Sequence, residues 1–261
     1  MTIFKHELRQ GWTMLFIWSG IIAFMLGICI GIYPEMTDQM EDISMMFADM
    51  GGFSAAFGMD RINFGEFTGF FSVECGNILG LGGAFFAALT GISALAKEER
   101  EHTAEFLLTH PVSRSAIVSQ KLLAIETQII ILNGVSIAIT ALSVLAIKET
   151  PDTQSLTLLF LSYFILQTEI AAICFGVSAF LHSSGLGIGL GIAALFYFLN
   201  IIANLSENAA FLKYITPFGY TEGADIFANG CIEGRYLFPG LVLGILGIAA
   251  AFYQYGKKDI L

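Results

Sequence analysis

Residues Ala96 to Lys121 read AKEEREHTAEFLLTHPVSRSAIVSQK, a charged and helix-favouring stretch between two long apolar runs. A single charged side chain at the centre of a bilayer costs about 2.5–3.5 kcal/mol on insertion scales, so charges at this density cannot lie in hydrocarbon. The stretch must therefore stand in water. The apolar runs on either side of it are then predicted to be membrane crossings.

The composition of the whole chain points the same way. Of 261 residues, 56 % are hydrophobic and 13 % are charged, whereas soluble domains carry about 25 % charged residues. Several apolar runs reach the ~20 residues that a helix needs to cross a bilayer, and backbone groups in lipid must bond within their own segment. We expect an all-α integral membrane protein whose residues 1–261 form a single transmembrane domain with six spans: Met14–Tyr33, Gly69–Ala96, Ile117–Ile147, Leu156–Leu181, Leu186–Leu205 and Tyr236–Tyr255.

The distribution of Lys and Arg predicts the orientation, because loops on the cytoplasmic side carry an excess of these residues. With six spans both termini share one side, and that side holds Lys5, Arg9, Lys97, Arg100, Arg114, Lys121, Lys257 and Lys258. The other side holds only Arg61, Lys148, Lys213 and Arg235. We therefore expect a multi-pass protein of the cell membrane with both termini in the cytoplasm.

Acidic residues show the opposite bias. The first outer loop contains Glu35, Asp38, Glu41, Asp42, Asp49, Asp60 and Glu66. The net charge of −10 is thus largely a property of the outer face, and no nucleic-acid partner is expected.

Two further amphipathic segments are predicted. Residues Met1 to Trp12 place apolar side chains near one face and are expected to form an interfacial helix on the inner leaflet. The outer loop from Pro34 to Phe67 has apolar residues at helical spacing, which suits either an amphipathic helix or a lid over the bundle. These residues are Ile43, Met46, Phe47 and Met50.

Small residues at helix-packing spacing predict close helix contacts. They are the pairs Gly27/Gly31, Gly76/Gly80, Gly187/Gly191 and Gly240/Gly244. Packing within the chain is the expected use of such pairs, ahead of dimerisation.

The stretch between the second and third spans has its own internal order. Lys97 and Glu101 are four residues apart, a pairing that stabilises a solvated helix. An apolar patch, Phe106 to Leu108, follows, Pro111 ends the helix, and Ser113 can cap the next one. A short helix is therefore expected across the cytoplasmic mouth of the bundle. The alternative is a solvated connector that binds no partner.

The same stretch resembles the E-x-x-x-x-T-x-E-x-L-L-x-x-P-V-S-R-x-x-I-x-x-x-K signature of type-2 ATP-binding-cassette (ABC) exporter permeases. The matching residues are Glu98 or Glu99, Thr103, Glu105, Leu107, Leu108, Pro111, Val112, Ser113, Arg114, Ile117 and Lys121. The six-span layout, the long first outer loop and the sequence LKYITPF at 212–218 agree with this family. At His102 the family often has Lys or Gly, a difference of surface charge.

The resemblance implies a membrane subunit that pairs with a second permease, identical or homologous, and binds two copies of a separate ABC ATPase subunit. It implies that the helix of the stretch is a coupling helix seated on that ATPase. The residues expected at this contact are Glu98, Glu99, Arg100, Glu101, Thr103, Glu105, Phe106, Leu107, Leu108, Pro111 and Arg114.

No nucleotide chemistry is expected in this chain itself. A P-loop requires G-x-x-x-x-G-K-[ST], and no Lys in the sequence is followed by Ser or Thr. We therefore predict that the chain is not an enzyme, has no catalytic or metal-binding residues, and binds no cofactor. ATP and Mg²⁺ would be held by the partner ATPase.

Three carboxylates lie within the apolar spans: Glu74, Glu126 and Glu169. Glu74 and Glu126 lie near span ends, where they can reach interfacial water. Glu169 lies near the middle of its span beside Gln167, so we expect it to face the bundle interior. It could line a substrate pathway with Gln167 and Glu126, bind a cationic group, or hydrogen-bond a neighbouring helix while protonated.

Two other functions remain open from the sequence. A secondary transporter coupled to ions or protons could use Glu169, although no internal repeat or pair of broken helices supports it. A membrane scaffold or sensor subunit without transport activity is the other alternative.

Overall fold

The computed structural model describes residues 2–36, 50–63, 65–97, 112–182 and 185–257, the side chains of Thr2 and Asp60 excepted. These residues form helices and connecting turns and include no strand. Six helical spans are long and apolar enough to cross a membrane, as the sequence predicts. The chain is therefore an all-α membrane protein.

The first span is one helix, α1 (Thr2–Met36), of 35 residues. At 1.5 Å per residue such a helix is about 52 Å long, well beyond the ~30 Å of bilayer hydrocarbon. The expected interfacial helix at residues 1–12 is thus helical from Thr2 onward but continuous with the span. Its position on the inner leaflet stays a prediction.

The second span is irregular. It consists of α4 (Phe67–Phe70), the π-helical segments η3 (Phe71–Cys75) and η4 (Ile78–Gly82), and α5 (Gly83–Ser93). A π-helical turn leaves backbone carbonyls poorly matched, and in lipid each needs a partner. Side chains supply some of these bonds: Ser72 Oγ donates to Gly69 O at 2.8 Å and Asn77 Nδ2 donates to Val73 O at 2.8 Å.

The third and fourth spans are long regular helices with side-chain caps. The third span, α8 (Arg114–Ile147), begins where Ser113 Oγ accepts a hydrogen bond from Ala116 N. The fourth span, α9 (Thr153–Ser178), is capped by Asp152, and the hydrogen bonds from Ser155 and then Gln154 hold the pKa of its carboxyl below the ordinary value. Capping oxygens of this kind satisfy backbone donors that have no partner inside the helix.

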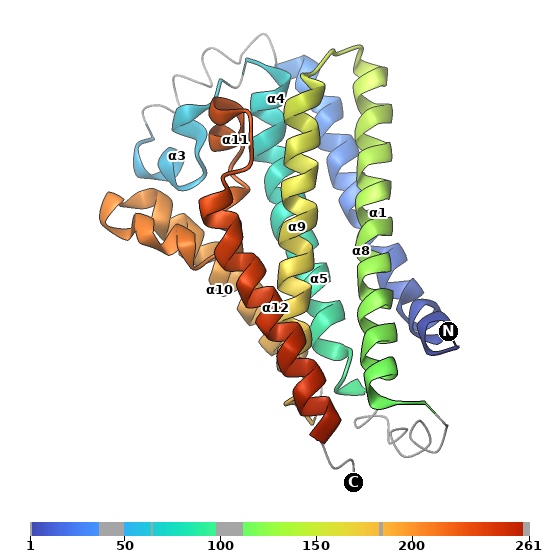
Figure 1. Cartoon of the computed structure of the whole chain (residues 1–261). Coiled ribbons are helices and arrows are strands. Elements are labelled where there is room, and N and C mark those ends of the chain that lie inside the picture. Colours follow the sequence, from blue (N-terminus) through green and yellow to red (C-terminus); the bar gives the residue numbers. More distant parts are fainter. Residues whose placement is uncertain (1, 37–49, 64, 98–111, 183–184, 258–261) are drawn as a thin grey trace.

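The last two spans are α10 (Leu186–Leu205) and α12 (Gly234–Lys257). Short elements connect the spans at one end of the bundle: α3 (Gly52–Ala56), η2 (Met59–Arg61), η5 (Glu207–Tyr214), η6 (Pro217–Tyr220) and α11 (Gly223–Asn229). We call this the loop end. Both termini lie at the opposite end, which we call the terminal end (Figure 1).

Burial distinguishes central from peripheral spans. In the most apolar stretch of the second span and of α9, 67 % of residues are buried, against 17–33 % in the other four spans. The peripheral helices expose large apolar side chains, among them Phe16, Phe24, Leu145 and Phe238. An apolar perimeter around a packed centre is the arrangement that lipid requires.

Helices α9 and α12 make a close backbone contact. A Cβ added at Gly176 would lie 2.5 Å from Gly247 O, and one at Gly247 would lie 2.5 Å from Ala172 O. Small residues let two backbones approach this closely. Of the predicted glycine pairs, Gly187 and Gly191 have no atom of the described residues within 4 Å of such a Cβ, so packing within that part of the chain does not explain them.

Candidate functional site

Most of the predicted coupling helix lies outside the described residues. This applies to Glu98, Glu99, Arg100, Glu101, Thr103, Glu105, Phe106, Leu107, Leu108 and Pro111, and in the first outer loop to Ile43, Met46 and Phe47. Their predicted roles stay predictions. We call residues 98–111 the coupling stretch, after this predicted role. The structure does describe the residues on either side of it, at the end of the second span and at the start of α8.

Lys121 connects these two points. Its side chain is fully buried, and Nζ donates to Ala94 O at 2.8 Å and to Glu7 Oε1 at 2.9 Å. Ala94 follows the last residue of α5, and Glu7 belongs to the first part of α1. One ammonium group therefore joins α8, the end of the second span and the N-terminal turns of α1.

The charge balance explains why a lysine can be buried here. Removing an ammonium group from water costs several kcal/mol unless a counter-charge and hydrogen bonds replace the water. The carboxylate of Glu7 supplies the counter-charge, and it also lies 3.8 Å from Lys97 Nζ. The carbonyl of Ala94 adds the partial negative charge of a helix C-terminus.

Arg114 makes a second connection at the terminal end. Its Nη1 donates to Tyr255 O and to Gly256 O, each at 3.2 Å. These carbonyls belong to the last turn of α12, where backbone acceptors lack helical partners. Arg114, predicted to contact the ATPase, thus also joins the start of α8 to the end of α12.

A cavity of about 220 Å³ lies beside Lys121. Glu7, Gln10, Lys97 and Gln128 contribute polar atoms to its lining. Gly11 lines it too, and a Cβ there would lie only 2.6 Å from Gln128 Oε1. The missing side chain of Gly11 thus allows Gln128 to lie against α1.

Within the membrane, Glu169 faces the bundle interior, as the sequence predicts, and is 2 % exposed. Tyr220 from η6 donates its hydroxyl hydrogen to Glu169 Oε2 at 2.7 Å. Gly240 on α12 lies against the same oxygen, since a Cβ there would be 2.3 Å away. Among the described residues Oε1 has no hydrogen-bond partner.

Gln167 lies in a different contact, between α8, α9 and the second span. Its Oε1 accepts from Asn133 Nδ2 at 2.7 Å, and its Nε2 donates to Leu79 O at 3.4 Å. Glu126, which is half-buried, accepts from Thr168 Oγ1 at 3.1 Å. Glu126 and Gln167 therefore belong to the α8–α9 side, whereas the partners of Glu169 are on η6 and α12.

The predicted pathway residues thus do not converge on one opening. None of Glu169, Gln167 and Glu126 lines the terminal-end cavity or a groove of about 850 Å³ between α8 and α9. The lining of that groove is mainly apolar and includes Ile137, Val144, Leu156 and Phe160. Each of the three polar residues instead has a partner inside the chain, and a pathway role stays a prediction.

An ionic cluster at the loop end was not anticipated from the sequence. Arg61 of η2 binds Glu222 Oε2 at 2.7 Å and Asp225 Oδ1 at 2.6 Å. Lys213 of η5 binds the same two carboxylates at 3.1 and 3.4 Å, and Asn200 of α10 donates to Glu222 Oε1 at 3.2 Å. The residues are up to 164 positions apart, so only their opposite charges on the same side of the membrane could have suggested the cluster.

The described residues contain no group of three or more His, Cys, Asp or Glu side chains arranged to hold a metal ion. Several of their buried polar groups are bonded across helices: Lys121 to Glu7, Gln167 to Asn133, and Glu169 to Tyr220. These bonds connect α8 to α1, α9 to α8, and α9 to η6.

Comparison with known proteins agrees with that description. The family model described as ABC-2 family transporter protein matches residues 1–229, which include the first five spans and the coupling stretch. No curated protein matches the chain. Because the family model covers well over half of its length, the chain belongs to the ABC-2 family of transporter proteins.

Proposed function

We propose that this chain is the permease subunit of an ABC exporter, which moves a substrate out of the cytoplasm with ATP hydrolysed by a separate ATPase subunit. Membership of the ABC-2 family supports a transporter subunit in the membrane. The sequence lacks a P-loop, so hydrolysis, with its ATP and Mg²⁺, is assigned to the partner. A second copy of the chain, or a homologous permease, would complete the complex.

The observation that carries this proposal is the junction at Lys121. A motor can bias a membrane bundle only through contacts that differ between its two states. In the sequence, residues 98–111 connect the end of the second span, which includes Ala94, to the start of α8, which carries Lys121. Lys121 bonds to Ala94 and to Glu7. A push on the stretch would therefore reach three spans at once, α1, the second span and α8.

The orientation belongs to the same proposal. The terminal end, with the greater share of Lys and Arg, would face the cytoplasm and the ATPase. The loop end, with the acidic first loop and the Arg61 cluster, would face outward.

Co-purification with an ATPase tests the proposal. The tagged chain is expressed in its own host, extracted in mild detergent and captured through its tag, and any ABC ATPase that co-purifies is identified by mass spectrometry. We expect the ATPase to be retained by the unaltered chain and largely lost from Glu105→Arg. The matched control is Glu149→Arg, which reverses the same charge at an exposed position after α8, at the loop end.

Two results would overturn the proposal. One is failure of the unaltered chain to retain any ATPase. The other is equal loss of the ATPase from Glu105→Arg and from Glu149→Arg, because the contact would then not involve the coupling stretch. The direction of movement is tested separately, by ATP-dependent uptake of a candidate substrate into inside-out vesicles.

A further inference from the structure

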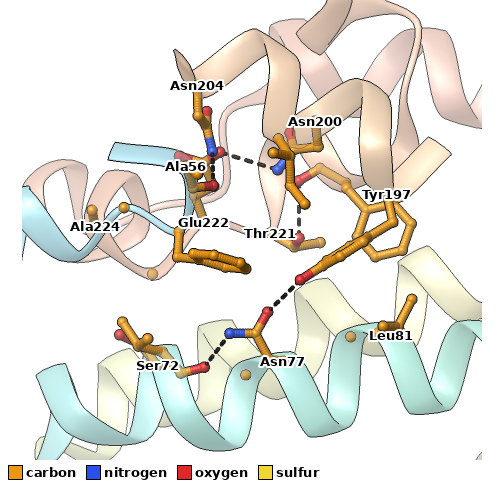
Figure 2. Close-up of a pocket in the computed structure, with 18 of the residues that line it drawn as sticks. Ala56, Ser72, Asn77, Leu81, Tyr197, Asn200, Asn204, Thr221, Glu222 and Ala224 are labelled. Carbon is orange, nitrogen blue, oxygen red and sulfur yellow. Dashed lines mark hydrogen bonds between the residues drawn. The ribbon is translucent and has the colours of Figure 1, made fainter. Parts of the chain in front are cut away.

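A small cavity lies in the loop-end half of the bundle (Figure 2). Its volume is about 70 Å³, and its walls come from the segment from α3 to Ile62, from η3, η4, α9 and α10, and from the segment from η6 to α11. Much of the lining is polar: Ser72, Asn77, Tyr163, Tyr197, Asn200, Asn204, Thr221 and Glu222. Neither the predicted coupling contact nor the predicted substrate pathway uses this cavity.

Hydrogen bonds fix two of its walls. Tyr197 on α10 donates its hydroxyl hydrogen to Asn77 Oδ1 at 2.9 Å, as Figure 2 shows, and Asn77 Nδ2 donates to Val73 O at 2.8 Å. Across the cavity Asn200 is held by its bond to Glu222. These hydrogen bonds hold the polar side chains of both walls in fixed positions.

Three polar groups of the lining have hydrogen-bonding capacity left over. Tyr163 is only 3 % exposed and lines the cavity, and none of the hydrogen bonds found among the described residues involves its hydroxyl. This hydroxyl lies against Gly76, where a Cβ would be 2.4 Å from it. The amide oxygens of Asn200 and Asn204 are buried and lack partners within the described part of the chain. A buried oxygen left unpaired costs about 1–3 kcal/mol.

The size and charge of the cavity define what it can hold. One water molecule needs about 10–15 Å³ of such space, so there is room for a few waters but not for a drug-sized ligand. The carboxylate of Glu222 is already paired with Arg61 and Lys213, so no uncompensated charge attracts an ion. A small neutral guest that both donates and accepts hydrogen bonds fits these conditions.

We propose that this cavity is a buried water-binding site, in which ordered water bonds to the Tyr163 hydroxyl and to the polar groups of α10. Water in such a position is part of the structure, because it satisfies polar groups that have no other partner. The site borders the π-helical segments η3 and η4. Their backbone can then exchange partners with water while the second span changes shape.

Hydroxyl-radical footprinting with X-rays tests this inference, because bound water generates radicals next to the side chains it touches. The purified full-length chain is irradiated in lipid nanodiscs, and oxidation of tyrosines is measured by mass spectrometry. Tyr220 is the internal control, since it is 2 % exposed and does not line the cavity. We expect Tyr163 to be oxidised several-fold faster than Tyr220. Equal rates for the two residues would overturn the proposal.

A filling variant provides a second test. A Cβ at Gly80 would lie 3.4 Å from the Tyr163 ring, an ordinary contact, so Gly80→Ala adds a methyl group to the cavity wall without a clash. We expect this variant to lower the oxidation of Tyr163 and to leave that of Tyr220 unchanged. If the oxidation of Tyr163 exceeds that of Tyr220 equally in both proteins, the radicals do not come from cavity water and the assignment fails.

Discussion

Lys121 Nζ lies 2.9 Å from Glu7 Oε1, across 114 positions of sequence, at the point where the predicted coupling stretch meets the membrane helices. The ammonium group is buried, and its second bond is to the carbonyl that ends α5. The N-terminal turns of α1 are thereby attached to both ends of the coupling stretch. A helix expected to lie on the inner leaflet is thus part of the same mechanical unit as the second and third spans.

Removal of the Glu7 carboxylate should destabilise this junction. Glu7→Ala removes the carboxylate that lies 2.9 Å from the buried Lys121 Nζ, and a hydrogen bond to a charged group contributes about 1.5–3 kcal/mol. We expect the free energy of unfolding to fall by about this amount. Thermal unfolding in detergent would show this fall as a lower unfolding temperature. Glu7→Gln should lose less, because the amide oxygen can still accept the bond.

The control for this prediction is Glu207→Ala, which removes an exposed carboxylate at the loop end. A double variant, Glu7→Ala with Lys121→Met, should recover part of the lost stability, since no buried charge is then left unpaired. Equal destabilisation by Glu7→Ala and Glu207→Ala would contradict the assigned role of the pair.

A side chain at position 240 should lower the stability of the protein while Glu169 is present. A Cβ at this position would lie 2.3 Å from Glu169 Oε2, the oxygen that accepts the bond from Tyr220. Gly240→Ala must displace the carboxylate and leave the Tyr220 hydroxyl unpaired, which costs about 1–3 kcal/mol. Thermal unfolding should show this loss. Gly234→Ala should not, because a Cβ at this position of the same helix meets no atom of the described residues within 4 Å.

The same change in a Glu169→Ala background separates packing from function. If the clash is with the carboxylate, Gly240→Ala should cost little there. The functional role of Glu169 is tested apart from this, by Glu169→Leu. A variant that assembles and transports like the unaltered protein would exclude Glu169 from the pathway.

Much of the architecture could be predicted because it follows from hydrophobic run length. A segment of about 20 apolar residues has no stable alternative to a helix in lipid, so all six helical spans were expected. Span ends were harder to place, because α1 continues to Thr2 through polar residues that local pattern assigns to a separate helix.

The pairing of buried polar groups could not be predicted in the same way. The sequence identified Lys121 as a signature residue and predicted an interfacial helix over residues 1–12, which include Glu7. Helical periodicity does not tell, however, which two helices will be neighbours. The spacing of glycines likewise does not tell which two helices will be in contact. Gly240 does pack closely, but the close backbone contact between Gly176 and Gly247 joins glycines that the spacing did not pair, on two helices far apart in the chain.

The loop-end cluster should depend more on Glu222 than on Arg61. Arg61 has a side chain 43 % exposed, so Arg61→Ala removes solvent-screened pairs that contribute up to about 1 kcal/mol. Glu222 is 10 % exposed and binds Arg61, Lys213 and Asn200. Glu222→Ala should therefore cause the larger fall in unfolding temperature. A larger effect of Arg61→Ala would show that Asp225 alone can hold the cluster.

The proposed orientation predicts which native cysteine can be labelled from outside the cell. Cys231 is exposed and follows α11 at the loop end, whereas Cys75 and Cys174 are buried and Cys29 is half-buried in α1. A membrane-impermeant maleimide added to intact cells should therefore modify Cys231, and Cys231→Ser should abolish the labelling.

The matched control is Lys257→Cys in the Cys231→Ser background, because Lys257 ends α12 at the terminal end. Its cysteine should react only after the membrane is made permeable. Labelling of Lys257→Cys in intact cells, together with no labelling of Cys231 in the unaltered chain, would reverse the orientation and place the coupling stretch on the wrong side for a cytoplasmic ATPase.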